Sequence, residues 1–178
     1  MKVFVFAGSL RAASFNRKLA ALAAESARRA GAEAELGDFR DYCPPIYDGD
    51  AEAAHGLPPE ARALAAKIEA ADAIVIASPE YNRSIPGPLK NALDWISRLK
   101  PYKLADKPVL MIGATSGKAA CANGFAALRI TLEFQTAKVY AESYGLNGGA
   151  TAFTADGRFA DTGEAERLDA LVKAFVTQ

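Results

Sequence analysis

The sequence has few of the residues that build disulfides, metal sites and membrane helices. It holds two cysteines, Cys43 and Cys121, and no Cys-x-x-Cys pair, which predicts free thiols in a reduced, cytoplasmic setting. The single histidine, His55, lies in a stretch rich in glycine and proline that is expected to be a loop, which argues against a metal site built on histidines. No segment approaches the ~20 consecutive apolar residues that a membrane helix needs. The start, MKVFVFAGSL, runs from a short apolar stretch directly into polar residues, so we expect no signal peptide there.

Net charge is also lacking. Lysine and arginine number 21 together, and so do aspartate and glutamate, which gives a formal net charge of zero. This balance argues against a nucleic acid or an anionic membrane as partner. The 178 residues, 51% of them hydrophobic, are enough for one domain, residues 1–178, whose core needs neither disulfides nor metal.

Short apolar runs alternate with amphipathic segments along the whole chain. The runs predict strands at residues 2–7, 32–37, 72–79, 107–115 and 138–141. The periodic segments predict helices at residues 16–30, 58–71, 87–99, 124–137 and 163–177, and residues 39–50 are expected to form a loop. Strands that are apolar throughout and alternate with helices indicate an α/β fold with a parallel sheet covered on both faces.

Three loops with unusual chemistry follow the first, third and fourth expected strands. They read GSLRAASFN, SPEYNRSIPG and GATSGKAACANG. In an open parallel sheet, ligands bind beyond the carboxyl ends of the strands. We therefore expect the functional site where these three loops meet.

The first loop has the donors of a phosphate site but matches no common phosphate motif. It has one glycine where the dinucleotide fingerprint has three, and it lacks Gly-Lys-Ser/Thr. Ser9, Arg11, Ser14 and Asn16 supply hydroxyl, guanidinium and amide donors just before a helix N-terminus, which itself favours an anion. This set suits a single phosphate monoester. The alternative is that Ser14 or Asn16 only caps the helix.

The second loop is stiff and carries an aromatic residue. Pro79 and Pro86 restrict its two ends, Tyr81 lies between them, and Gly87 permits a sharp turn into the next helix. Such a loop, with exposed backbone amides, can pack on a planar heterocycle. An ordinary β–α turn in which Pro86 starts a helix explains the same residues.

The two loops together resemble the NADPH-dependent FMN reductase family, which includes quinone and chromate reductases and related azoreductases. GSLRAASFN and SPEYNRSIPGPLKNALDW both match that family at the right separation, over roughly residues 2–137. The resemblance implies a flavodoxin-like three-layer sandwich with a five-stranded parallel sheet in the order 2-1-3-4-5. It also implies bound FMN, NADPH or NADH as transient hydride donor, and a homodimer or homotetramer with the flavin near the subunit interface.

The resemblance also implies the cofactor-binding residues. Ser9, Arg11, Ser14 and Asn16, with the amides near Phe15, would hold the phosphate; Pro79, Glu80, Tyr81, Asn82 and Ser84 would line the ring and the ribityl chain, with Ser116 and Gly117 from the third loop. The third loop departs from the family, which usually carries Gly-Gly and then arginine. Here Ala120, Cys121 and Asn123 stand at about those positions, which puts flavin affinity or the shape of the acceptor pocket in question.

The predicted function is an FMN-dependent NAD(P)H oxidoreductase that transfers hydride by a ping-pong mechanism. Its acceptor would be a flavin, a quinone, an azo compound or a metal oxyanion such as chromate, and no catalytic acid, base or metal is assigned. The alternatives are a flavodoxin-like electron-transfer protein, which the balanced charge disfavours, and a binding or regulatory protein with weakened flavin affinity. We expect Cys121 to be a buried, inert thiol, Trp95 to lie in the core or at an interface, and Asp48, Asp50 and Glu52 to be a solvated run.

Overall fold

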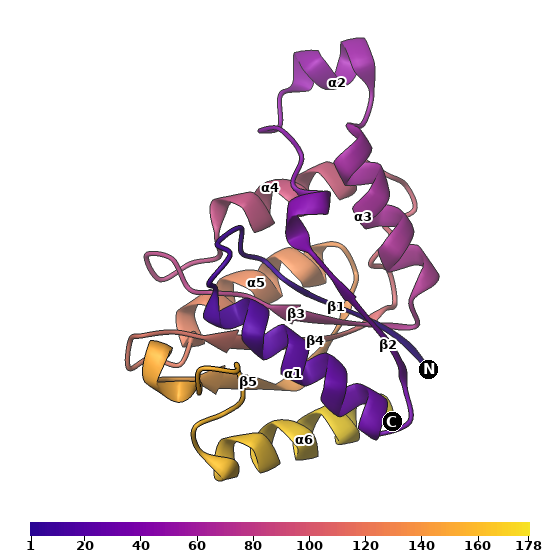
Figure 1. Cartoon of the computed structure of the whole chain (residues 1–178). Helices are drawn as coiled ribbons and strands as arrows, with labels where there is room; N and C mark the ends of the chain where they lie inside the picture. Colours follow the sequence, from indigo (N-terminus) through magenta and orange to yellow (C-terminus); the bar gives the residue numbers. More distant parts are fainter.

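Five parallel strands form the centre of the molecule. The computed structural model describes residues 1–178. The strands are β1 (Lys2–Ala7), β2 (Glu33–Gly37), β3 (Ala73–Ala77), β4 (Pro108–Ala114) and β5 (Lys138–Leu146) (Figure 1). They lie in the order β2-β1-β3-β4-β5, and every neighbouring pair is parallel. The predicted flavodoxin-like order is therefore confirmed.

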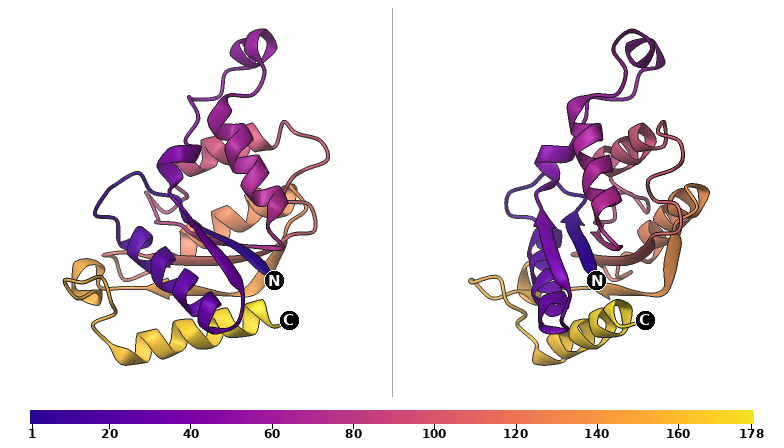
Figure 2. Two further views of the ribbon diagram at one scale, coloured as in Figure 1. Left: turned by 45° about the vertical axis from the view of Figure 1, so that its right-hand side comes forward. Right: turned by 90° about the vertical axis from the view of Figure 1, so that its right-hand side faces the viewer.

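Helices cover both faces of the sheet and enclose two apolar layers. One face carries α1 (Phe15–Arg29) and α6 (Thr162–Val176); the other carries α3 (Pro59–Ala70), α4 (Gly87–Ile96) and α5 (Ala122–Phe134) (Figures 1 and 2). The strands serve both layers because successive side chains point to opposite faces. In β1, Val3 and Val5 pack toward α1 and α6, whereas Phe4 and Phe6 pack toward the other three helices. None of the helices has the length and apolar character required to cross a membrane.

Two segments differ from the sequence-based prediction. The expected loop at residues 39–50 contains a 3₁₀ helix, Phe39–Tyr42, and the start of a short helix, α2 (Gly49–His55). The carboxylate of Asp48 accepts hydrogen bonds from the backbone at the start of α2, which explains why a helix begins there. Strand β5 is longer than the predicted residues 138–141 because residues 143–146 continue the pairing with β4 beyond an irregularity in the register. A second 3₁₀ helix, Gly149–Ala152, follows it.

Residues 43–58 form an arm that projects from the body beside α4 (Figures 1 and 2). No residue of its helix α2 is buried, and Ile46 is 80% exposed. The base of the arm is nevertheless firmly attached. Asn91 of α4 bonds to Pro44, Pro45 and Tyr47, and the indole N–H of Trp95 donates to the carbonyl of Pro45 at 2.8 Å. The arm is therefore an ordered projection that presents an apolar side chain to the surroundings.

Candidate functional site

The loops after β1, β3 and β4 meet in one hollow at the carboxyl edge of the sheet. It has a volume of about 110 Å³. Its lining residues are Ser9, Arg11, Ser14, Phe15, Asn16, Pro79, Glu80, Tyr81, Ala114, Thr115 and Ser116. All except Ala114 and Thr115 belong to the residues predicted from the sequence. Those two end and follow β4, so the strand-end rule that identified their neighbours also applies to them. Asn82, Ser84 and Gly117 belong to the same loops but do not line the hollow.

The first loop offers an unusual number of free backbone donors. Ser14 is the N-cap of α1, and its hydroxyl accepts the N–H of Asn16 at 3.2 Å. The helix-cap interpretation of Ser14 is thus confirmed, and it accounts for only one N–H. The N–H groups of residues 10–13 and of Phe15 have no acceptor within the chain. A loop of this kind before a helix N-terminus is a ready site for an anion.

Two side chains add to these donors. Ser9 is 3% exposed, and its hydroxyl makes no hydrogen bond within the chain although it borders the hollow. Arg11 is exposed and has no carboxylate partner. The charge of this guanidinium is not neutralised inside the protein, so it is available to a ligand phosphate.

Asn16 has a different task from the one expected. Its side chain is 3% exposed and forms two hydrogen bonds with the backbone of Ala114, one from Nδ2 to the carbonyl at 2.8 Å and one from the N–H to Oδ1 at 2.9 Å. The amide that the sequence predicts as a phosphate donor is therefore engaged with the last residue of β4. Asn16 fixes the start of α1 to the sheet edge and so holds the first loop in place.

The second loop contains a tight two-residue turn, flanked by Tyr81 and Ser84. The backbone N–H of Tyr81 donates to the carbonyl of Ser84 at 2.9 Å, and the N–H of Ser84 donates back at 3.0 Å. Between them, Asn82 and Arg83 have φ angles of +51° and +63°, as a hairpin turn with two left-handed residues requires. Neither residue is a glycine, so the turn stores backbone strain of the kind that often marks a functional site. The N–H groups of Asn82 and Arg83 are free.

The side chain of Glu80 points from the second loop toward α5. Its carboxylate accepts the backbone N–H of Gly124 at 2.9 Å and lies 3.5 Å from the side-chain nitrogen of Asn123. The sequence-based prediction places Glu80 along the flavin. In the structure it still borders the hollow, but both carboxylate oxygens face the third loop and its helix.

The third loop keeps a left-handed backbone without glycine. Ala120 and Cys121 have φ angles of +47° and +61°, at about the positions where the family carries its glycine pair. Gly145 of β5 allows the loop to lie against the sheet, since a Cβ atom there would be 2.1 Å from the carbonyl oxygen of Ala120. The side chain of Asn147 accepts the N–H of Ala120 at 3.0 Å and orders the loop further.

The remaining candidate residues have structural tasks. Burial, with a smaller effect of the Glu80 carboxylate, raises the pKa of Cys121 to about 11, and its thiol is fully buried. The expected burial is confirmed, and the inertness of the thiol stays a prediction. Trp95 is buried in this chain. Glu52, in helix α2 of the arm, pairs with Arg98 just after α4, so it is not simply a solvated residue. No group of three or more His, Cys, Asp or Glu side chains is arranged to hold a metal ion.

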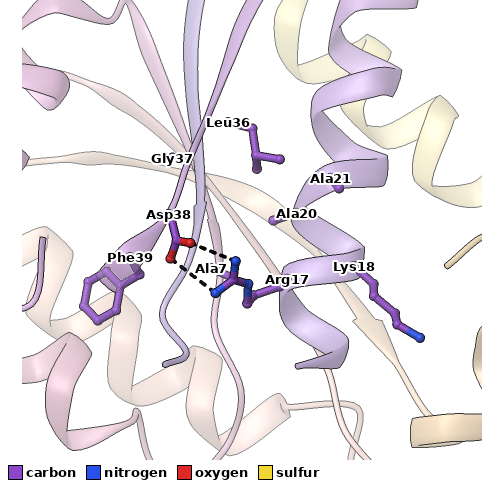
Figure 3. Close-up of a pocket in the computed structure, with 9 residues that line it drawn as sticks. All are labelled: Ala7, Arg17, Lys18, Ala20, Ala21, Leu36, Gly37, Asp38 and Phe39. Atoms are coloured by element: carbon purple, nitrogen blue, oxygen red, sulfur yellow. Dashed lines mark hydrogen bonds and ion pairs between the residues drawn. The ribbon is translucent and has the colours of Figure 1, made fainter. Parts of the chain in front are cut away.

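A larger groove of about 390 Å³ runs between α1 and β2 (Figure 3). Apolar residues including Leu36 and Ala20 form its walls, and Figure 3 shows Arg17 and Asp38 pointing toward one another, 2.8 Å apart. Hydrogen bonds from Arg40 and Arg17 hold the pKa of the Asp38 carboxyl well below its usual range. These charges satisfy each other, whereas the smaller hollow, where three loops meet, has the unpaired donors of the first loop. The hollow is therefore the better candidate for a ligand site.

Known proteins resemble this chain along most of its length. Residues 1–151 match the family model of NADPH-dependent FMN reductases. A quinone reductase of Escherichia coli is 42% identical over 117 residues, which cover 66% of this chain and 61% of that protein, so the chain spans about three fifths of that relative's length. An NAD(P)H-dependent FMN reductase of Pseudomonas aeruginosa is 34% identical over 175 residues, which cover 98% of this chain and 92% of that protein.

A solved structure agrees with the fold and with the sequence likeness. The flavoenzyme FerB of Paracoccus denitrificans, an NAD(P)H:(acceptor) oxidoreductase, superimposes with a TM-score of 0.84 at 33% identity, covering 99% of this chain and 95% of that one. The family match spans both loops that carry the resemblance in the sequence. The chain belongs to the NADPH-dependent FMN reductase family.

Proposed function

We propose that this chain is an FMN-dependent NAD(P)H oxidoreductase that passes electrons by ping-pong hydride transfer to a small acceptor. The acceptor classes are a flavin, a quinone, an azo compound or a metal oxyanion such as chromate. FMN, when bound, supplies the chemistry: its ring accepts a hydride from NADPH or NADH and passes the electrons on. The observation that carries the proposal is the convergence of three loops on a hollow with unpaired donors.

The first loop fits the phosphate of FMN. The free N–H groups of residues 10–13 and of Phe15, the hydroxyl of Ser9 and the guanidinium of Arg11 can surround a phosphate monoester at the start of α1. Asn16 holds this cradle to β4. No lysine lines the hollow, and no acidic cluster is available for magnesium, in keeping with a monophosphate.

The second and third loops would hold the rest of the cofactor. Pro79 and Tyr81 would contact the ribityl chain and the ring, and the free N–H groups of Asn82 and Arg83 would face a polar ring edge. Ser84, Ser116 and Gly117 stay proposed contacts on these loops. The proposal assigns no catalytic acid or base to the chain, since Glu80 is engaged with α5 and Cys121 is buried with a raised pKa.

We further propose that a second copy of the chain completes the site. A hollow of about 110 Å³ is smaller than the several hundred Å³ of sites that enclose a cofactor, so one chain leaves the flavin ring open. The surface of the arm carries Ile46, which is 80% exposed, and would take part in the interface. A homodimer or homotetramer would cover that surface, and sedimentation velocity of the purified protein measures which forms. A monomer at micromolar concentration would contradict it. The two unpaired thiols support a cytoplasmic location.

A flavin-binding and reduction experiment tests the proposed activity. The purified protein is mixed with FMN, and its spectrum is recorded before and after anaerobic NADPH or NADH, followed by a quinone. Bleaching of bound flavin by NAD(P)H and its reoxidation by the quinone would support the oxidoreductase. Bound flavin that NAD(P)H cannot reduce would indicate an electron-transfer protein, and no FMN binding would reject both.

A further inference from the structure

Residues 81–84 make no hydrogen bond to any other part of the protein. The residue just before them, Glu80, does: its carboxylate accepts the N–H of Gly124 in the first turn of α5. The Tyr81–Ser84 pair is internal to the turn, and the hydroxyl of Ser78 bonds only to the adjacent Pro79. Residues 81–84 are all exposed. Ile85 packs against the core on the far side of the turn, so the contact of Glu80 is its hydrogen-bonded attachment on the near side.

Helix α5 has a backbone N–H group available for this contact because no side chain of its own caps its N-terminus. The residue at its N-cap position, Cys121, has a left-handed backbone and no side-chain hydrogen bond to the helix. Glu80 takes that role from a loop some forty residues earlier, and a carboxylate is favoured at a helix N-terminus. Leu128 and Leu132 bury the other side of α5 against the sheet. The contact thus ties an exposed turn to a helix that is fixed in the core.

A glycine at position 124 permits the close approach. A Cβ atom there would lie 3.3 Å from Cβ of Glu80, which is tighter than an ordinary contact. The backbone of Gly124 does not have a positive φ, so the backbone does not require a glycine. A side chain at this position would instead press Glu80 away by a few tenths of an ångström.

We propose that Glu80 is the positioning residue of the turn at residues 81–84 and holds the free N–H groups of that turn where the flavin ring binds. The inference rests on the proposed function. It assigns Glu80 no direct contact with the flavin, and it predicts that the contact acts on the ring end of the ligand rather than on the phosphate end.

Titrations with two ligands test the inference. FMN and riboflavin share the ring and differ in the phosphate. We expect Glu80→Ala to weaken the binding of both by roughly tenfold, as loss of a charge-assisted hydrogen bond implies. Glu80→Gln keeps an oxygen that can accept the Gly124 N–H and should recover most of the affinity. Glu133→Ala, at the exposed far end of the same helix, is the matched control and should leave both affinities unchanged.

Gly124→Ala separates positioning from stability. Alanine favours the helix, so the melting temperature should stay the same or rise, whereas the displaced Glu80 should weaken the binding of both ligands several-fold. Hydrogen exchange of the ligand-free protein gives a second readout: the N–H groups of Tyr81 and Ser84 should exchange faster in Glu80→Ala than in the wild type.

The outcomes distinguish this inference from the proposed function. If the wild type binds neither ligand, both fall. If it binds FMN and riboflavin but Glu80→Ala binds them equally well, the function stands and the positioning role is refuted. An effect of Glu80→Ala on FMN alone would also refute it, because it would place the action at the phosphate. Equal loss of both ligands, with recovery in Glu80→Gln, supports it.

Discussion

Replacement of Arg11 by alanine probes the phosphate end of the site. The guanidinium is exposed and has no partner within the chain, so its removal leaves no buried charge and should change the free energy of unfolding by less than ~0.5 kcal/mol. A hydrogen bond to a charged group contributes about 1.5–3 kcal/mol, and solvent around an exposed side chain favours the lower half of that range. About 1.5–2 kcal/mol corresponds to FMN binding about 10 to 30 times weaker.

Quenching of flavin fluorescence measures this change directly. Riboflavin lacks the phosphate, so its affinity should be the same in the wild type and in Arg11→Ala. Lys138→Ala removes one exposed positive charge at the start of β5, the opposite edge of the sheet, and should leave FMN binding unchanged. Equal losses for FMN and riboflavin, or an unchanged FMN affinity, would remove Arg11 from the phosphate site. The effect of Arg11→Ala should also shrink at high salt, because salt screens exposed charges.

Three further predictions concern the framework of the site. Asn16→Ala leaves the N–H and carbonyl at the end of β4 without their partners, so the free energy of unfolding in urea should fall by about 2–4 kcal/mol, and a loss below ~1 kcal/mol would show that water replaces the side chain. Gly145→Ala forces a Cβ atom against the Ala120 carbonyl and should lower both the melting temperature and FMN affinity; a variant as stable as the wild type would mean that the third loop moves freely. With a pKa of about 11, Cys121 is only about 0.1% thiolate at pH 8, so a thiol reagent should modify it only after denaturation, and fast labelling of the native protein would contradict the burial described.

The sequence predicted the order of elements along the chain and the meeting of the three loops because both depend on local patterns. Apolar runs mark the buried strands, and the strand-end rule then brings the three loops together. It could not show how individual polar groups pair. Asn16 looked like a ligand donor because its partner, Ala114, lies 98 residues away and offers only backbone atoms.

The same limit applies to Glu80 and to α2. The carboxylate of Glu80 caps a helix that begins about forty residues later, which no local motif reveals. Helix α2 is short and has no buried face, so it lacks the periodic apolar pattern from which helices are predicted. The bond of Glu80 joins segments that are distant in the sequence, and α2 begins at a single capping side chain, Asp48. A local apolar pattern reveals neither.

The segment of residues 78–95 contributes to two different surfaces. Its first half forms the turn beside the hollow, and its second half, in α4, provides Asn91 and Trp95, which hold the base of the arm. A rigid helix connects the two, and each residue added to a helix rotates the residues after it by about 100°. One inserted or deleted residue between Gly87 and Asn91 would therefore turn the arm's attachment points away from the arm while leaving the turn intact. The turn and the base of the arm are therefore held in register by a helix of fixed length.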